Sequence, residues 1–161
     1  MNTVQKENLL KEIEKLHKKN EFSRIKSDDY FEPGNMEYLE HYDGYFVEST
    51  GEIVIRFEAK GTRYEGRTEQ IEKVKIGDPI RVSRDKENIY NPNNFMLMTH
   101  KGQNVGTMPA ELCNAIASLY DAGELEFIKA SVSYVEPISK RSRYAKQAML
   151  FVELRGRVHL L

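Results

Sequence analysis

Several features are scarce or missing in this chain of 161 residues, and each scarcity argues against a class of protein. The chain has one cysteine, so it cannot form an internal disulfide, which suits a reducing compartment. Its longest uninterrupted apolar run, Ala148 to Val152, is far shorter than a membrane span. The first residues lead into charged ones rather than into the apolar core of a signal peptide. We therefore expect a cytoplasmic protein with no membrane partner.

Patterns typical of catalysis and of cofactor binding are also sparse. The four histidines lack metal-ligand spacing, and no glycine-rich phosphate-binding loop is present. Cys113 shares a helical stripe with apolar residues, which favours a core position over a nucleophile. Glu58-Ala59-Lys60 matches the end of a nuclease motif, with Asp43 as an upstream metal ligand, but a chain with 30% charged residues produces such triplets by chance. We expect no catalytic residue, no metal and no cofactor.

The net charge of −1 argues against a strongly basic nucleic-acid protein, but it hides an asymmetry. Up to Ser49 there are 7 lysines and arginines against 11 acidic residues, a net charge of −4. From Thr50 onward there are 17 against 14, a net charge of +3. No lysine or arginine occurs between Lys26 and Arg56. This asymmetry indicates two segments with different roles.

The first segment, residues 1–50, is predicted to be an amphipathic helix followed by an acidic and aromatic extension. Leucine and isoleucine recur at helical spacing within residues 4–19, with lysines and glutamates on the other side. This apolar stripe must pack on the second segment, on a partner protein or on the same helix of a second chain. Residues 27–49 combine acidic and aromatic side chains around a turn signal, Pro33-Gly34-Asn35.

The second segment, residues 52–158, is predicted to be a small β-rich barrel of the α+β class. Period-two alternation begins at Glu52, and further strands are expected at Ile80–Ser83, Phe95–Thr99, Phe127–Val135 and Gln147–Val158. Turn signals separate them at 61–66, 77–79, 88–94 and 101–104. Pro109 opens a helix over 110–122, and Gly123 closes it.

The run from Arg84 to Phe95, RDKENIYNPNNF, resembles the central motif of HIRAN domains. The glycine–aromatic loop from Gly61 to Gly66, Gly77-Asp78 and the run from Val105 to Pro109 follow in that family's order and spacing. The resemblance covers about residues 52–158. Within the family, the chain resembles the stand-alone bacterial type. The resemblance implies a modified OB-like or SH3-like β-barrel.

The resemblance also implies a ligand, because the best-understood members capture a 3′ end of single-stranded DNA. By position, Arg63 and Tyr64 line the groove, Asn91 lies near the terminal 3′-hydroxyl, and Thr107 edges the pocket. Lys86 replaces the family's usual proline, Asn94 its alanine and Asn91 its aspartate. An amide accepts a weaker hydrogen bond from a hydroxyl than a carboxylate does.

The same residues have plainer interpretations. The Asn-rich run from Asn88 to Asn94 is first of all a turn, because asparagine bonds its own backbone. Arg63-Tyr64 suits base stacking with a backbone contact, and equally an exposed surface loop. The basic residues around Tyr144 fit a phosphate-tracking lip or a solubilising hairpin tip. They are Lys140, Arg141, Arg143 and Lys146.

These observations predict a non-catalytic module that binds nucleic acid, as single-stranded DNA or exposed 3′ ends. The predicted binding residues are Arg63, Tyr64, Arg84, Asn91, Asn93, Lys101, Thr107, Arg141 and Arg143. The first alternative is a protein-interaction or dimerisation module that acts through the N-terminal helix. A metal-dependent nuclease is the second alternative.

Overall fold

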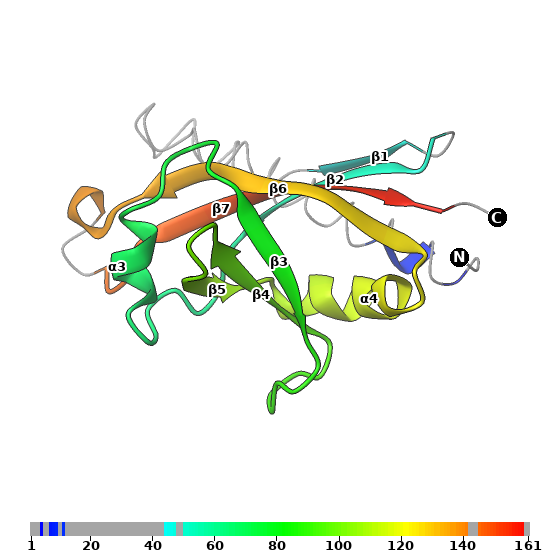
Figure 1. Ribbon diagram of the computed structural model, residues 1–161, viewed down its shortest axis with the longest axis horizontal. Helices are drawn as coiled ribbons and strands as arrows, with labels where there is room; N and C mark the ends of the chain where they lie inside the picture. Colours follow the sequence, from blue (N-terminus) through cyan, green and yellow to red (C-terminus); the bar gives the residue numbers. More distant parts are fainter. Residues whose placement is uncertain are drawn as a thin grey trace.

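The computed structural model describes residues 4, 7–9, 11, 44–47, 50–141 and 145–159. Its strands form two antiparallel sheets, one lying across the upper part of Figure 1 and the other below it with helix α4. The four-stranded sheet has the order β1 (Gly44–Val47), β2 (Glu52–Glu58), β7 (Met149–Val158), β6 (Leu125–Glu136). The three-stranded sheet has the order β3 (Ile80–Asp85), β4 (Asn94–Thr99), β5 (Asn104–Thr107). The helical elements are α3 (Arg67–Ile71), α4 (Ala110–Asp121) and the 3-10 turn η2 (Ile138–Lys140).

The predicted strands and the predicted second helix are confirmed, for the local reasons expected. On β2, Ile53, Ile55 and Phe57 are buried in the core, and they alternate with Arg56 and Glu58. Helix α4 starts after Pro109 and turns its apolar side to the core. Gly123 follows it with φ of 76°, the left-handed conformation that ends many helices. Helix α3 was not expected from the sequence.

The predicted barrel is confirmed only in part, because the described strands make two sheets whose backbones pair with each other only at isolated bridges and do not close. Lys60, just after β2, pairs with Thr107 of β5, and Pro79, just before β3, pairs with Ser131 of β6. Beyond Pro79 the edges of β3 and β6 diverge, as Figure 1 shows.

The core lies between the two sheets and is closed by α4. Phe95 of β4 meets Tyr120 of α4 edge-on, with ring centroids 5.2 Å apart, and Phe127 of β6 lies against both rings. Cys113 is buried in this core, as predicted. Burial raises the pKa of its thiol to about 11.

The N-terminal segment is described only at a few positions. Val4, Glu7 to Leu9 and Lys11 are helical, and Leu9 is buried in the core. The rest of the predicted helix over 4–19 lies outside the described residues, so that helix stays a prediction. Of the acidic and aromatic segment over 27–49, only β1 is described, and it pairs with β2. Among the described residues no helix is long and apolar enough to cross a membrane.

Candidate functional site

The loop of residues 61–66 is braced from the inside. Arg67 donates from Nη1 to the carbonyl oxygen of Gly61 at 3.0 Å and fills the space beneath the loop. Gly61 has φ of 67°, and a Cβ there would lie 2.9 Å from that same nitrogen. Thr62 is buried and donates to the carbonyl oxygen of Ala148 at 3.1 Å. The loop is therefore held on both sides, with its middle residues facing outward.

Arg63 and Tyr64 form one exposed unit at the middle of this loop. The Arg63 guanidinium carbon lies 4.8 Å from the centroid of the Tyr64 ring, a cation–π contact. Arg63 Nη2 also donates to the Tyr64 hydroxyl at 2.6 Å. The positive charge remains at the surface beside a half-exposed ring. This arrangement offers a cation and a flat aromatic surface to a ligand.

The loop of residues 86–93 is held by asparagine side chains, as the turn interpretation predicted. Asn88 Oδ1 accepts from the backbone N–H groups of both Tyr90 and Asn91 at 2.9 Å. Asn91 Oδ1 accepts from the backbone N–H of Asn93 at 3.0 Å. Because these bonds fix the backbone, the loop holds its tip in one conformation.

The amides of Asn91 and Asn93 converge on one residue of α4. Both donate to Asn114 Oδ1, at 3.2 Å and 3.1 Å. Asn91 therefore uses its amide nitrogen and one acceptor position inside the protein. Asn91 Oδ1 keeps a second acceptor position, which is what a ligand hydroxyl would require.

Arg84, a predicted binding residue, is placed as an internal brace. Its Nε and Nη2 donate to the two carboxylate oxygens of Asp121 at 3.0 Å and 3.1 Å. Its Nη1 donates to the carbonyl oxygens of Pro92 and Asn94 at 2.7 Å and 3.1 Å. Its side chain is only 12% exposed. These bonds tie the loop over 86–93 to the end of α4.

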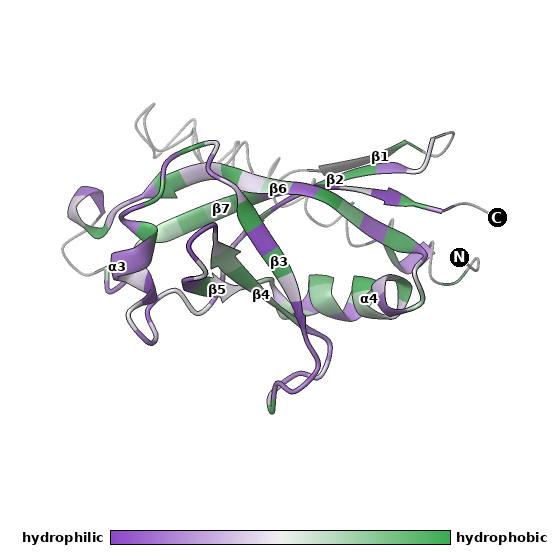
Figure 2. Ribbon diagram, viewed as in Figure 1, coloured by the Kyte–Doolittle hydropathy of each residue, from purple (hydrophilic) through white to green (hydrophobic). Residues whose placement is uncertain are grey.

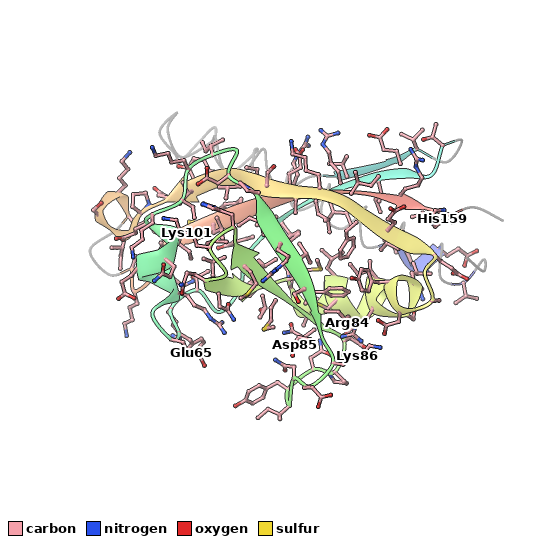
Figure 3. All side chains as sticks on the ribbon, viewed as in Figure 1. Glu65, Arg84, Asp85, Lys86, Lys101 and His159 are labelled. Carbon is pink, nitrogen blue, oxygen red and sulfur yellow. The ribbon has the colours of Figure 1, made fainter. Side chains whose placement is uncertain are left out.

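We call the two loops of residues 61–66 and 86–93 the loop face. Figure 3 shows Glu65 on the first loop, and Asp85 and Lys86 at the start of the second, on the same lower side of the molecule. Thr107 lies between the loops in the strand register, since it pairs with both Lys60 and Met96. The structure therefore brings Arg63, Tyr64, Asn91, Asn93 and Thr107 to one side.

Lys101 lies apart from the second loop. It follows β4, whereas the loop over 86–93 precedes that strand. Six strand residues separate the two ends by about 17 Å. Figure 3 places Lys101 well away from Asp85 and Lys86.

The connection between β6 and β7 approaches the loop face from another direction. Thr68 accepts from the N–H of Ala148 at 3.3 Å and donates to the carbonyl oxygen of Thr62 at 3.0 Å. Arg141 donates to the carbonyl oxygen of Gln147 at 2.6 Å, so it closes its own loop. Arg143 and Tyr144 lie outside the described residues.

Similarity to known proteins identifies the family of this chain. The chain matches the HIRAN domain family over residues 53–153. The chain belongs to the HIRAN domain family. This confirms the resemblance carried by the motif from Arg84 to Phe95. No curated protein matches the chain.

Solved structures share the fold of this HIRAN domain at low sequence identity. The crystal structure of the HIRAN domain of human HLTF is 17% identical, with a TM-score of 0.51, over 70% of this chain and 84% of that one. A crystal structure of a protein from Lactobacillus plantarum is 18% identical, with a TM-score of 0.51, over 68% of this chain and all of that one. Both establish the fold.

The tip of the second loop of this HIRAN domain carries two exposed residues that were not among the predicted binding residues. Ile89 is 87% exposed and Tyr90 is 90% exposed. Figure 2 shows this apolar tip at the end of an otherwise hydrophilic loop. The available signal was two bulky residues inside an Asn- and Pro-rich run, but only the asparagines of that run were predicted to contact the ligand.

The geometry of the described residues gives little support to the alternative of a metal-dependent nuclease. Glu58 and Lys60 lie with Oε2 and Nζ 3.5 Å apart, so each offsets the charge of the other. The part of the chain that the structure describes holds no group of three or more histidine, cysteine or acidic side chains suited to a metal. Asp43, the other member of the pattern, lies outside the described residues.

Proposed function

We propose that residues 52–158 form a non-catalytic module that binds single-stranded nucleic acid, DNA with an exposed 3′ end in particular, on the loop face. The observation that carries the proposal is the Arg63–Tyr64 unit, a surface cation stacked on a half-exposed ring in a braced loop. Every base has a π-face, and a guanidinium binds phosphate well. HIRAN family membership supports the same ligand class.

The proposed roles differ among the candidate residues. Arg63 binds a backbone phosphate, and Tyr64 and Tyr90 present ring surface to bases. The second acceptor position of Asn91 receives the terminal hydroxyl, with Asn93 and Thr107 beside it. Arg84 positions the loop rather than touching the ligand. Arg141 and Arg143 are assigned contacts to backbone phosphates, and Lys101 is assigned a contact to a longer strand only.

Pre-organisation is the physical reason to favour binding at this face. Asn88 and Arg67 fix the two loops through backbone contacts before any ligand arrives. A ligand then does not have to order the protein loops, and this ordering is a large cost of association. Stacking on a fixed ring is worth about 1–3 kcal/mol per base.

Fluorescence anisotropy with labelled oligonucleotides tests the proposal on the full chain. Arg63→Ala is expected to weaken binding and to reduce the salt slope, because one phosphate contact is lost. Arg157→Ala is the matched control, since Arg157 is exposed and pairs in register with Glu52 and Glu126 far from both loops. Unchanged affinity of Arg63→Ala, or an equal loss in both variants, would count against the loop face.

A second comparison tests end recognition. Oligonucleotides with a free 3′-hydroxyl are expected to bind more tightly than the same strands blocked by a 3′-phosphate. Asn91→Asp, which restores the carboxylate implied by the family motif, is expected to increase that preference. Equal affinity for free and blocked ends in both proteins would leave binding of single strands and remove the end from the proposal.

The alternative function, partner binding or dimerisation through the N-terminal helix, makes a different prediction. The near-neutral net charge favours it. It predicts that the full chain sediments as a dimer or captures a protein partner, and that substitutions on the loop face leave this association unchanged.

A further inference from the structure

A second recess lies between the two sheets, where the edges of β3 and β6 separate. This cleft has a volume of about 720 Å³. Its walls come from the first half of β3 and the first half of β6, and Tyr120, Leu125 and Leu154 contribute to its apolar lining. It contains none of the residues of the loop face and is independent of the function proposed above.

The cleft exists because the antiparallel pairing of β3 with β6 stops. Val132 donates to the carbonyl oxygen of Asp78 at 2.9 Å and accepts from the N–H of Gly77 at 2.8 Å. Past the bridge of Pro79 to Ser131, no further bridge pairs β3 with β6 among the described residues. Both strands are the outer strands of their sheets here, so each faces the cleft with an edge not paired to another strand.

Two positive charges oppose closure of this cleft. Continuing the register from Pro79 and Ser131 by two residues would place Arg81 directly opposite Lys129. Like charges directly opposite each other destabilise an antiparallel pair. Both side chains are exposed, and neither forms an ion pair or hydrogen bond within the described residues. An acidic side chain between them would turn this repulsion into two attractions.

The lining specifies the rest of the ligand. Ile128 lies at a bulge of β6 and is 59% exposed beside the cleft. The rings of Phe127 and Tyr120 lie with their centroids 4.8 Å apart, and both residues contribute to the apolar lining of the cleft. Side chains of an extended peptide alternate between two faces, so one set would meet the apolar lining and the other the charged rims. Glu126 also lines the cleft, with Oε2 3.8 Å from His159 Nε2, so the cleft carries one acidic side chain beside the two cations.

We propose that the cleft between β3 and β6 binds an extended peptide segment of a partner protein, with alternating apolar and acidic residues, as an added β-strand. Strand edges supply backbone hydrogen bonds to such a peptide, and pockets for alternate side chains supply specificity. A nucleic acid lacks the backbone donors and acceptors at strand spacing that these edges match. The volume accommodates a segment of a few residues rather than a domain.

Amide chemical shifts of the ¹⁵N-labelled full chain test this proposal. The probe is a short synthetic peptide of alternating valine and glutamate, and the controls are the valine–lysine peptide and a valine–glutamate peptide with a central proline. The valine–glutamate peptide is expected to shift amides within 80–82 and 125–130. The two controls are expected to bind at least roughly fivefold more weakly, given the size of exposed charge pairs.

Charge exchange makes the test specific to the cleft. Lys129→Glu is expected to weaken the valine–glutamate peptide roughly fivefold and to strengthen the valine–lysine peptide. Lys75→Glu is the matched control, because Lys75 is exposed and does not line the cleft. Circular dichroism checks that both variants fold.

Three results would overturn the proposal. The first is a set of peptide shifts that is absent or that falls on the loop face. The second is equal binding of the two charged peptides to the native chain and to Lys129→Glu. The third is a shift of the cleft amides by a single-stranded oligonucleotide and not by peptide, which would make the cleft a nucleic-acid surface.

Discussion

Replacing Arg84 by methionine tests whether this residue braces the loop face or binds the ligand directly. Methionine keeps an unbranched stem against the Phe95 ring, over which the guanidinium carbon lies 5.4 Å from the centroid. It removes the paired bonds to Asp121 and leaves the carbonyl oxygens of Pro92 and Asn94 without their donor. The change therefore removes the polar contacts and retains much of the packing.

The expected loss of stability follows from these bonds. Hydrogen bonds from a charged donor contribute about 1.5–3 kcal/mol each when buried. The Asp121 side chain is 31% exposed and can bind water after the substitution, so the loss of its two bonds contributes less to the loss of stability. We expect a loss of about 2–3 kcal/mol in the free energy of unfolding. For a chain of this length that lowers Tm by roughly 5–10 °C.

The effect depends on pH in a defined direction. The hydrogen bond from Arg84 holds the pKa of Asp121 below its ordinary value of 3.8. A carboxylate with a lowered folded-state pKa adds stability above its unfolded pKa and loses it as the pH falls through the folded value. The stability gap between the native chain and Arg84→Met should therefore be full near neutral pH and narrow below about pH 4. Urea unfolding at several pH values measures it.

Asp121→Asn separates the two roles of Arg84. If Arg84 is a brace, this variant is destabilised in the same direction as Arg84→Met, and its affinity for oligonucleotides does not rise. If Arg84 contacts phosphate, freeing it from Asp121 strengthens oligonucleotide binding while stability barely changes. Stronger binding by Asp121→Asn at unchanged Tm would refute the brace.

Two further predictions concern the second loop and the core. Asn88→Ala removes the acceptor of two backbone N–H groups and should lower Tm by roughly 2–4 °C, while oligonucleotide binding falls as the loop loses its fixed conformation. Glu87→Ala, in the same exposed loop, is the control, and equal effects of the two would contradict this account. Because burial raises the pKa of Cys113 to about 11, the native thiol should react with a thiol reagent at pH 8 only as fast as the protein opens. Immediate labelling of the folded protein would be the contrary result.

The parts of the fold that were predictable are those set by neighbouring residues. Period-two alternation located β2, β6 and β7, turn signals located β3 and β4, and proline and glycine located the ends of α4. Helix α3 was missed because it spans five residues and buries only Ile71, too few for a helical stripe. The lack of closure could not be predicted, because closure depends on whether β3 pairs with β6, strands that are far apart in the sequence.

The site was predictable in residue type rather than in geometry. The sequence pointed to Arg63 and Tyr64 through their glycine-bounded loop, and the structure exposes both. It could not reveal that Arg84 is bound by Asp121, because that contact spans 37 positions. Lys101 was predicted to bind because of its charge, although it lies at the other end of β4 from the loop over 86–93. Patterns among neighbouring residues do not show which distant residues come into contact or how far apart two loops lie.

The pairing of charges around the loop face bears on the kind of nucleic acid it suits. Most cations near these loops already have an acidic neighbour: Lys60 with Glu58, Arg67 with Glu65, and Arg84 and Lys86 with Asp121. Arg63 differs, since its recorded partner in the described chain is the Tyr64 hydroxyl and ring. Because most cations in the described part of these loops have an acidic neighbour, binding there releases few counterions, and each phosphate contact adds only about 0.7 to the salt slope of a single strand.

A surface of this kind is poorly suited to tracking a long phosphate backbone. If the loop face binds nucleic acid as proposed, its affinity has to come from stacking on Tyr64 and Tyr90 and from hydrogen bonds to a few groups, and contacts to uncharged groups release no counterions. With such contacts, a strand end that has an exposed base and a free terminal group is expected to bind more tightly than the interior of a strand. The near-neutral charge of the chain, which first argued against nucleic-acid binding, is therefore compatible with a short or end-restricted site.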